Sequence, residues 1–323
     1  MEWIKASSPI AFPGLGFEIN PPQGFTVGGF EVMFYGLIIG LGLVLCCIYG
    51  LRRGKDFGLT QDDILDGALW IIPFAIVCAR LYYCAFYWEQ GGYGKNPVSI
   101  LYLWEGGLAI YGGVIGAAIG IVIYCLCKKI PITTCLDITF ITFPIGQAIG
   151  RWGNFFNREA FGDQTDSFLR MGLKLTEDGR AASEMFYYHP TFLYESVWNI
   201  LGFVLLHFAS KKRKYEGQMA LCYVLWYGLG RTMIEGLRTD SLMWGPFRVS
   251  QLLAAVSCLA AAWILVWQMF RPHDPAKLYV NRVAAKQAAE SAVIAETTEE
   301  EVKEEPTEEE NSEEETPAEE TEN

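Results

Sequence analysis

Seven long apolar stretches dominate this sequence, and they restrict the fold more than any other feature. A helix crosses the hydrocarbon core of a bilayer with about 20 mostly apolar residues. We therefore expect an all-α polytopic membrane protein with seven transmembrane helices. The predicted spans are residues 27–51, 64–88, 108–127, 133–150, 191–209, 218–234 and 249–270.

Basic clusters follow every odd-numbered span, and Lys and Arg in short loops mark the cytoplasmic side of a membrane protein. This alternation predicts an N-terminus outside the membrane and a C-terminus in the cytoplasm. It also supports the fourth span, which contains Asp137 and Pro144, because without that span the alternation would fail. The clusters are Arg52, Arg53 and Lys55; Lys128 and Lys129; Lys211, Lys212, Arg213 and Lys214; and Arg271 and Lys277.

The negative charge of the chain is concentrated in its tail. The formal net charge is −12, whereas residues 296–323 hold fifteen Glu and one Lys, a sum of −14 that leaves +2 for the rest. Such a like-charged segment is typical of disorder. We expect an extracytoplasmic or interfacial segment at 1–26, a membrane domain with the candidate catalytic residues at 27–272, and a cytoplasmic tail at 273–323 that is disordered from about 296. The 151–189 loop is the first candidate for a small extracytoplasmic cap, and the 89–106 loop is the second.

The cysteines and the spaced glycines are interpreted as structural residues, and the histidines do not suggest a metal site. The nine cysteines lie almost entirely in apolar runs without a CxxC pair, and the three histidines are scattered, so we expect buried thiols and no metal site. Glycines spaced four apart, as at Gly112 and Gly116 or at Gly36 and Gly40, predict close packing between helices.

Charged groups at membrane depth are the informative residues, because an Arg at a helix centre costs about 2.5–3.5 kcal/mol there. Arg151 and Asn154 are three apart and share a helix face, and Glu159 follows at the expected outer surface. The planar fork of Arg matches phosphate oxygens. Arg151 could instead extend its side chain to the interface, but the density of polar residues and glycines around it favours a binding site.

A second polar face lies at the outer end of the sixth predicted span. Four side chains fall within one narrow arc of a helix at about 100° per residue. Arg231 and Glu235 could form a structural ion pair at i,i+4, which would leave one guanidinium in excess and favour an anion as its partner. The four residues are Tyr227, Arg231, Glu235 and Arg238.

Three further candidates are Tyr111 at the start of the third predicted span, His189 before the fifth, and Tyr35 in the first. Tyrosine is enriched at membrane interfaces, so Tyr111 and Tyr35 could be simple anchors. With the arginines, however, they gather at the outer end of a helix bundle. The ligand that this set suggests is an anionic lipid headgroup from the outer leaflet.

Four motifs then occur in order along the chain. On them the chain resembles the prolipoprotein diacylglyceryl transferase family, from about Phe30 to Phe270. The motifs are Tyr-Gly at Tyr35, the run GRWGNFFNRE from Gly150 to Glu159, HPTFLYE from His189, and Tyr-x-x-x-Arg-x-x-x-Glu from Tyr227.

The resemblance implies an enzyme of the bacterial cytoplasmic membrane. Such an enzyme would transfer the diacylglyceryl group of phosphatidylglycerol to the lipobox cysteine thiol of a prolipoprotein and release glycerol 1-phosphate. This is the first step of lipoprotein maturation, and it implies no metal, no cofactor and no nucleic acid. By the motif match, Arg151 and Asn154 would contact the lipid headgroup, with support from Glu159.

The same match extends to the sixth span. Arg231, held by Glu235, would bind or polarise the phosphate. Tyr227 and Tyr35 would line the same cavity, and we expect Arg238 at the phospholipid as well.

The identity of the general base stays open. Many family members have His where this chain has Tyr111, and Tyr titrates near 10. The candidates are Tyr111, His189, or no dedicated base, with a substrate thiol whose pKa is lowered by Arg; we favour the last.

Two other functions fit part of the pattern. A membrane transporter for an anionic solute would also need arginines in a cavity, but it predicts polar residues that continue to the cytoplasmic face, whereas here they cluster at the outer ends. Another phospholipid-using transferase is compatible with the composition. An intramembrane protease is not supported, because Asp137 stands alone and HExxH is absent.

Overall fold

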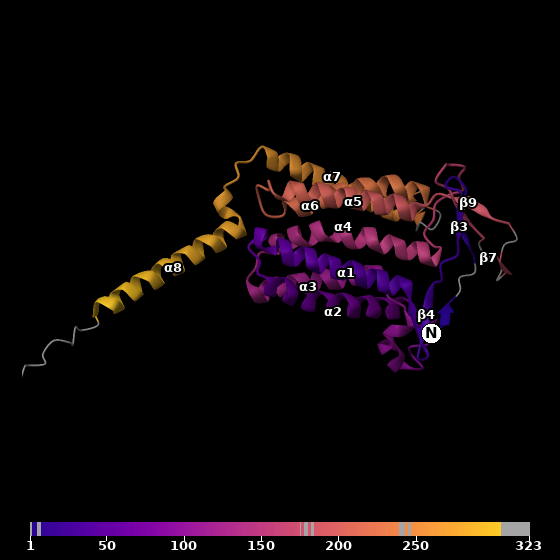
Figure 1. Cartoon of the computed structure of the whole chain (residues 1–323), viewed down its shortest axis with the longest axis horizontal. Coiled ribbons are helices and arrows are strands. Elements are labelled where there is room, and N and C mark those ends of the chain that lie inside the picture. The colour runs from indigo at the N-terminus through magenta and orange to yellow at the C-terminus, as the bar shows by residue number, and fades with distance from the viewer. Residues whose placement is uncertain are drawn as a thin grey trace, which may run out of the picture. The chain divides into compact units, whose positions relative to one another are not determined.

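The computed structural model describes residues 2–4, 8–174, 176–177, 180–181, 184–238, 243–244 and 247–304. Seven long helices run side by side (Figure 1), and each overlaps one predicted span. Six of them are long and apolar enough to cross a membrane, and α6 is shorter, with 17 residues. The helices are α1 (Phe34–Arg53), α2 (Gln61–Phe86), α3 (Ile110–Lys128), α4 (Ile132–Asn157), α5 (Thr191–Ser210), α6 (Gln218–Ile234) and α7 (Val249–Met269).

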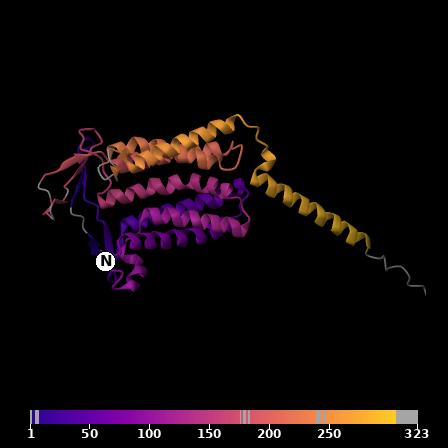
Figure 2. The same cartoon turned by 180° about the vertical axis from the view of Figure 1, so that it is seen from behind.

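Helix α4 lies between two groups of helices. It packs against α1 on one side and against α5 and α6 on the other, while α2 packs on α3 and α6 on α7 (Figure 2). The α2–α3 contact confirms the prediction from glycine spacing, because a Cβ on Gly116 would lie only 2.3 Å from the carbonyl oxygen of Phe74. The same prediction is wrong for Gly36 and Gly40, which face open space.

Short β-strands cover one end of the bundle, which corrects the prediction of an all-α fold. The N-terminal segment pairs with the 151–189 loop, and Ile10 faces Leu173 across an antiparallel pair. Both residues are fully buried in a small second core that includes Phe155 of α4. Within the described residues, the strands form four sheets: β1 (Glu2–Ile4), β4 (Gly24–Val27) and β5 (Phe30–Met33); β3 (Phe17–Ile19), β2 (Ile10–Phe12), β6 (Met171–Leu173) and β9 (Phe186–Tyr188); β7 (Thr176–Glu177) and β8 (Arg180–Ala181); β10 (Met243–Trp244) and β11 (Phe247–Arg248).

The 89–106 loop lies at the same end and is held to α2 by Arg80. This side chain is buried and donates hydrogen bonds to the carbonyl oxygens of Ser99 (2.7 Å), Ile100 (2.9 Å) and Gly106 (2.6 Å). Carbonyl oxygens are strong acceptors for a guanidinium, so one residue fixes the loop that leads into α3. The loop contains the 3₁₀ turns η2 (Pro97–Leu101) and η3 (Leu103–Glu105).

Asp137 shows how the fourth span accommodates a carboxylate at the opposite end of the bundle. It is fully buried on α4 and accepts the backbone N–H groups of Gly217 (2.9 Å), Met219 (2.9 Å) and Ala220 (3.0 Å). The first N–H groups of a helix have no acceptor within that helix. Asp137 therefore caps the start of α6 from a neighbouring helix.

The last described helix, α8 (Tyr279–Glu304), continues past residue 296, from which the sequence predicts disorder. The chain divides into two compact units, Met1–Asn281 and Arg282–Asn323, and helices α1 to α7 belong to the first. The remainder of the acidic tail, 305–323, lies outside the described residues.

Candidate active site

Glu195 is the centre of a charged cluster at the end of the bundle that carries the strands. It lies in the second turn of α5 and is only 6% exposed. Its Oε2 atom is 2.6 Å from Nη2 of Arg151 and 3.7 Å from Nη1 of Arg231. Its Oε1 atom is 3.3 Å from Nη1 of Arg238. One carboxylate thus joins α4, α5, α6 and the segment after α6.

A second carboxylate, that of Glu235, holds Arg231 from the other side. Its Oε2 atom lies 2.6 Å from Nη2 of Arg231, which confirms the predicted i,i+4 ion pair. The hydroxyl of Ser250 donates to Oε1 of Glu235, and Arg248 donates to its backbone carbonyl. Glu235 is fully buried, and it begins the 3₁₀ turn η4 (Glu235–Leu237) that follows α6. The orientation of Arg231 is therefore set from two directions.

The arginines of the cluster are more accessible than its two glutamates. The guanidinium-bearing side chains keep some exposure, with 22% for Arg151, 17% for Arg231 and 11% for Arg238. The two carboxylates are almost completely covered. Hydrogen bonds from Arg to phosphate are short and strong, so the accessible side of the cluster is suited to an anion.

Asn154 connects the cluster to Glu159. Nη1 of Arg151 lies 3.4 Å from Oδ1 of Asn154, and Nδ2 of Asn154 donates to Oε1 of Glu159 at 2.9 Å. Arg151 and Asn154 therefore share a helix face as predicted. Asn154 is buried in the last turn of α4, so its amide holds two charged side chains in fixed positions.

Two tyrosines of the predicted site pack against the helices that carry the cluster. A Cβ on Gly153 would lie 2.6 Å from the ring of Tyr35, so the glycine allows α1 to approach α4 beside Arg151. Tyr227 stacks on Tyr223 with ring centroids 5.7 Å apart. The hydroxyl of Tyr223 in turn donates to Oε1 of Gln147 at 3.0 Å.

The two candidate bases have partners outside the charged cluster. His189 precedes α5, and its Nδ1 atom is 3.3 Å from the hydroxyl of Tyr194. Tyr111 is 56% exposed at the start of α3, and its ring lies 6.4 Å from that of Tyr82. The described contacts do not bring either residue into the network around Glu195. In the described part of the chain, no group of three or more His, Cys, Asp or Glu side chains is placed to hold a metal ion.

Comparison with known proteins agrees with the motifs. The family model of prolipoprotein diacylglyceryl transferase matches residues 22–267, which are 246 of the 323 residues. The chain belongs to this family. With its apolar helices, this membership makes the chain a bacterial membrane protein.

Three curated relatives carry the name phosphatidylglycerol–prolipoprotein diacylglyceryl transferase. The relative from Listeria welshimeri is 39% identical over 266 residues, which cover 81% of this chain and 95% of that protein. The relative from Lactiplantibacillus plantarum is 41% identical over 79% of this chain and 90% of its own length. The relative from Limosilactobacillus reuteri is 40% identical over 84% of this chain and 98% of its own length.

Glu195 is the main residue of this family member's cluster that sequence reasoning missed. It ends the HPTFLYE run, but its partners are far away in the chain, and Arg238 for example is 43 residues distant. Ser250 and Arg248 were missed for the same reason. Only the run itself could have pointed to Glu195, because a glutamate among apolar residues of a span needs a partner.

An apolar groove of about 250 Å³ lies between α4 and α5, the helices that carry Arg151 and Glu195 in this diacylglyceryl transferase homologue. It runs along α4 and α5, and two of its lining residues, Trp152 and Ser196, directly follow Arg151 and Glu195 in the chain. Other parts of the wall are apolar, with Ile149, Ile200 and Phe203 among them. The groove and the cluster thus share two helices, α4 and α5.

Proposed function

We propose that this chain transfers the diacylglyceryl group of phosphatidylglycerol to the lipobox cysteine thiol of a prolipoprotein and releases glycerol 1-phosphate. Membership of the family and the names of its relatives support this activity. The observation that carries the mechanism is the pairing of Arg151 and Arg231 on the carboxylate of Glu195. The proposal includes seven membrane spans, with the cluster at the outer leaflet of the bacterial cytoplasmic membrane.

The chemistry explains why arginines are needed. The sulfur of the substrate cysteine attacks the diacylglycerol carbon that carries the phosphate ester. A C–S bond forms, the C–O bond to phosphate breaks, and the bonding electrons leave with the glycerol phosphate, which thereby gains one negative charge. Guanidinium groups fixed in advance stabilise that charge most where water is excluded. Arg151 and Arg231 are held in this way by buried carboxylates.

The neighbouring groups fit the rest of the lipid. The groove along α4 and α5 offers an apolar surface for an acyl chain on the helices that carry Arg151 and Glu195. Asn154 contacts Arg151 and is itself held by Glu159, and Arg238 supplies a further cation. The nucleophile belongs to the substrate, so the chain's own cysteines have no part in the reaction.

We propose that no dedicated base removes the thiol proton and that the arginines lower the pKa of the bound substrate thiol instead. Replacing Tyr111 by Phe tests this directly, because it removes only the hydroxyl. We expect the Tyr111→Phe enzyme to transfer diacylglyceryl within about threefold of the wild-type rate. His189→Ala in the same assay is the companion variant, and a loss of about 100-fold in either one would identify that residue as the base.

The activity itself is tested with purified protein, phosphatidylglycerol and a lipobox peptide, by following glycerol phosphate release. Release should require the peptide cysteine, so a Cys-to-Ser peptide is the matched control. Arg151→Ala should reduce the rate by about 100-fold or more. If a folded wild-type preparation releases no glycerol phosphate but conducts anions across liposomes, the transporter hypothesis replaces this proposal.

A further inference from the structure

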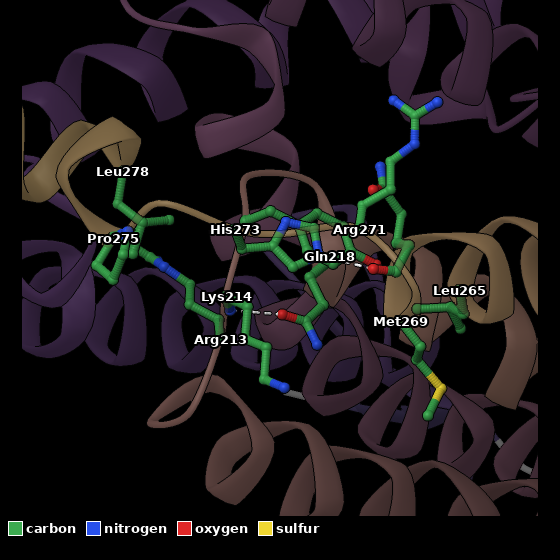
Figure 3. A pocket seen from close by; sticks show the side chains of 11 residues that line it. Arg213, Lys214, Gln218, Leu265, Met269, Arg271, His273, Pro275 and Leu278 are labelled. Carbon is green, nitrogen blue, oxygen red and sulfur yellow. Dashed lines mark hydrogen bonds between the residues drawn. The ribbon is translucent and has the colours of Figure 1, made fainter.

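A second pocket, of about 520 Å³, lies at the end of the bundle opposite the Glu195 cluster (Figure 3). One wall is the turn before α6 with the first residue of that helix, and the other is the end of α7 with the segment after it. Helix α6 begins at this pocket and ends at the cluster, and its 17 residues separate the two by about 25 Å at 1.5 Å per residue. Six of the eleven lining residues follow residue 267, where the family match ends.

The pocket is lined by basic side chains and by no acidic one. Arg213, Lys214 and Arg271 carry positive charge, whereas none of the eleven lining residues is Asp or Glu. Figure 3 shows Lys214 and Arg271 on opposite sides of Gln218 and His273, with their charged ends pointing away from each other. The guanidinium of Arg271 lies over the ring of Trp267, 3.8 Å from its centroid. A surface of this composition attracts anions.

The acidic residues nearest in sequence are occupied elsewhere. Asp137 caps the start of α6 as described above. The carboxylate of Glu216 accepts the hydroxyl of Thr134 at 2.5 Å and the backbone N–H of Tyr279 at 2.8 Å. Neither lines the pocket, but both act electrostatically on Arg213, whose guanidinium is buried over the ring of Phe57. The exposed Lys214 and Arg271 are therefore the cations that can meet an external ligand.

The wall also contains a buried hydrogen-bond donor, the hydroxyl of Tyr215. The hydroxyl of Tyr215 is buried and has no hydrogen-bond partner among the described residues, and its ring stacks on that of His273 at 4.7 Å. Burial raises the pKa of Tyr215 further above neutral, with added effects of Cys222 and Asp137, so the hydroxyl stays a donor. A buried donor without an acceptor is destabilising, and phosphate oxygens are strong acceptors.

One side of the pocket is apolar and lies at the end of a membrane span. Leu265 and Met269 of α7 line it, and Met269 is 80% exposed beside the equally exposed Phe270. A soluble anion would gain nothing from this wall. A ligand that joins a phosphate to acyl chains would cover it while its headgroup meets Lys214 and Arg271.

We propose that this pocket binds the phosphate group of an anionic phospholipid, in the leaflet opposite the one that the Glu195 cluster faces. Basic pockets at the cytoplasmic ends of membrane helices are suited to such headgroups. This inference rests on the placement of the bundle in a membrane and not on the transferase reaction.

The test uses the full chain purified in detergent, with phosphatidic acid as the probe and native mass spectrometry to count bound lipid. The double variant Lys214→Gln/Arg271→Gln removes two basic residues, and each is expected to contribute about a fivefold factor to the affinity for the headgroup. The dissociation constant for phosphatidic acid should therefore rise roughly 20- to 30-fold. The matched control, Lys212→Gln/Lys277→Gln, removes the same charge from exposed residues outside the pocket and should bind like the wild type.

Three results would overturn the proposal. An equal loss in the control variant would mean general surface attraction, and equal binding of phosphatidylcholine would mean that the phosphate charge is not recognised. Competition by inorganic phosphate at the concentration of the lipid would assign the pocket to a soluble anion.

Tyr215→Phe, which removes only the buried hydroxyl, should also weaken binding and provides a test if the double variant does not fold. Diacylglyceryl transfer should persist in the double variant, so failure of this proposal is separable from failure of the proposed function.

Discussion

At the scale of single residues, Glu195 has to balance more than one arginine. Arg151, Arg231 and Arg238 each place a guanidinium nitrogen within 3.7 Å of its carboxylate. Like charges repel strongly where water is scarce, so this buried carboxylate sets the spacing of the three cations. A bound phosphate would share those cations with Glu195.

Glu195→Gln should therefore affect both stability and activity. The substitution keeps the shape of the side chain but leaves several partly buried arginines without their shared counterion, and breaking a buried pair costs about 3–5 kcal/mol. We expect a clearly lower thermal unfolding temperature in detergent and a transfer rate lower by about two orders of magnitude. Glu18→Gln, at an exposed position of β3, should match the wild type in both assays. A Glu195→Gln enzyme with wild-type rate and stability would show that the arginines are positioned by other groups.

The sequence predicted the contacts of this cluster that lie within one helix, but not those between helices. Arg231 and Glu235 are one helical turn apart, so their pairing follows from local spacing. Arg151 and Asn154 are linked in the same way. Glu195 meets its partners only because α4, α5 and α6 converge, and no local pattern encodes that convergence.

At the scale of helices, α6 depends on its neighbour for its first turn. Three backbone N–H groups at its start, including those of Gly217 and Met219, donate to the buried carboxylate of Asp137 on α4. Removing an N-cap side chain costs about 0.5–2 kcal/mol, and leaving several buried donors without an acceptor costs more. The same contact fixes α6 to α4, and Arg231 lies at the far end of α6.

Asp137→Ala should lower the free energy of unfolding by about 2–4 kcal/mol. The measurement is thermal or denaturant unfolding of the purified protein in detergent, with Asp166→Ala as a control at an exposed loop position. Transfer activity of the folded fraction should fall less than stability does, because Asp137 is remote from the cluster. Unchanged stability in the Asp137 variant would mean that the cap is dispensable.

The helices and the strands differed in how well they could be predicted. A span is recognisable from apolar length alone, and so all seven helices overlap their predicted ranges. The strands are two to four residues long, which is too short for an alternating pattern to stand out. Their partners are also distant, since Ile10 pairs with Leu173, and such pairing is decided by tertiary structure.

At the scale of the whole bundle, the two ends differ in their charged groups. The basic clusters after α1, α3, α5 and α7 lie at the end that holds the Lys214–Arg271 pocket, while the Glu195 cluster lies at the other. Helix α6 is the shortest span, with 17 residues, near the lower limit of about 17–25 for crossing a bilayer. The turn η4 continues it to Leu237, so the sixth crossing that the alternation requires is physically possible.

This arrangement predicts that the 89–106 loop faces the outside and that the 129–131 and 211–217 turns face the cytoplasm. Alkaline phosphatase fused after Asn96 should be active in bacterial cells, because the enzyme matures only outside the cytoplasm, whereas fusions after Lys129 and after Lys214 should be inactive. A fluorescent protein fused after Lys277 should fluoresce. Immunoblots of each fusion control for expression.

Activity of the fusions after both Lys129 and Lys214 would mean that the protein has the opposite orientation. The arginines would then lie at the cytoplasmic leaflet, where secreted prolipoproteins do not present their cysteine. Activity at Lys214 alone would mean that either α4 or α5 does not cross, although these two helices pack side by side in the bundle.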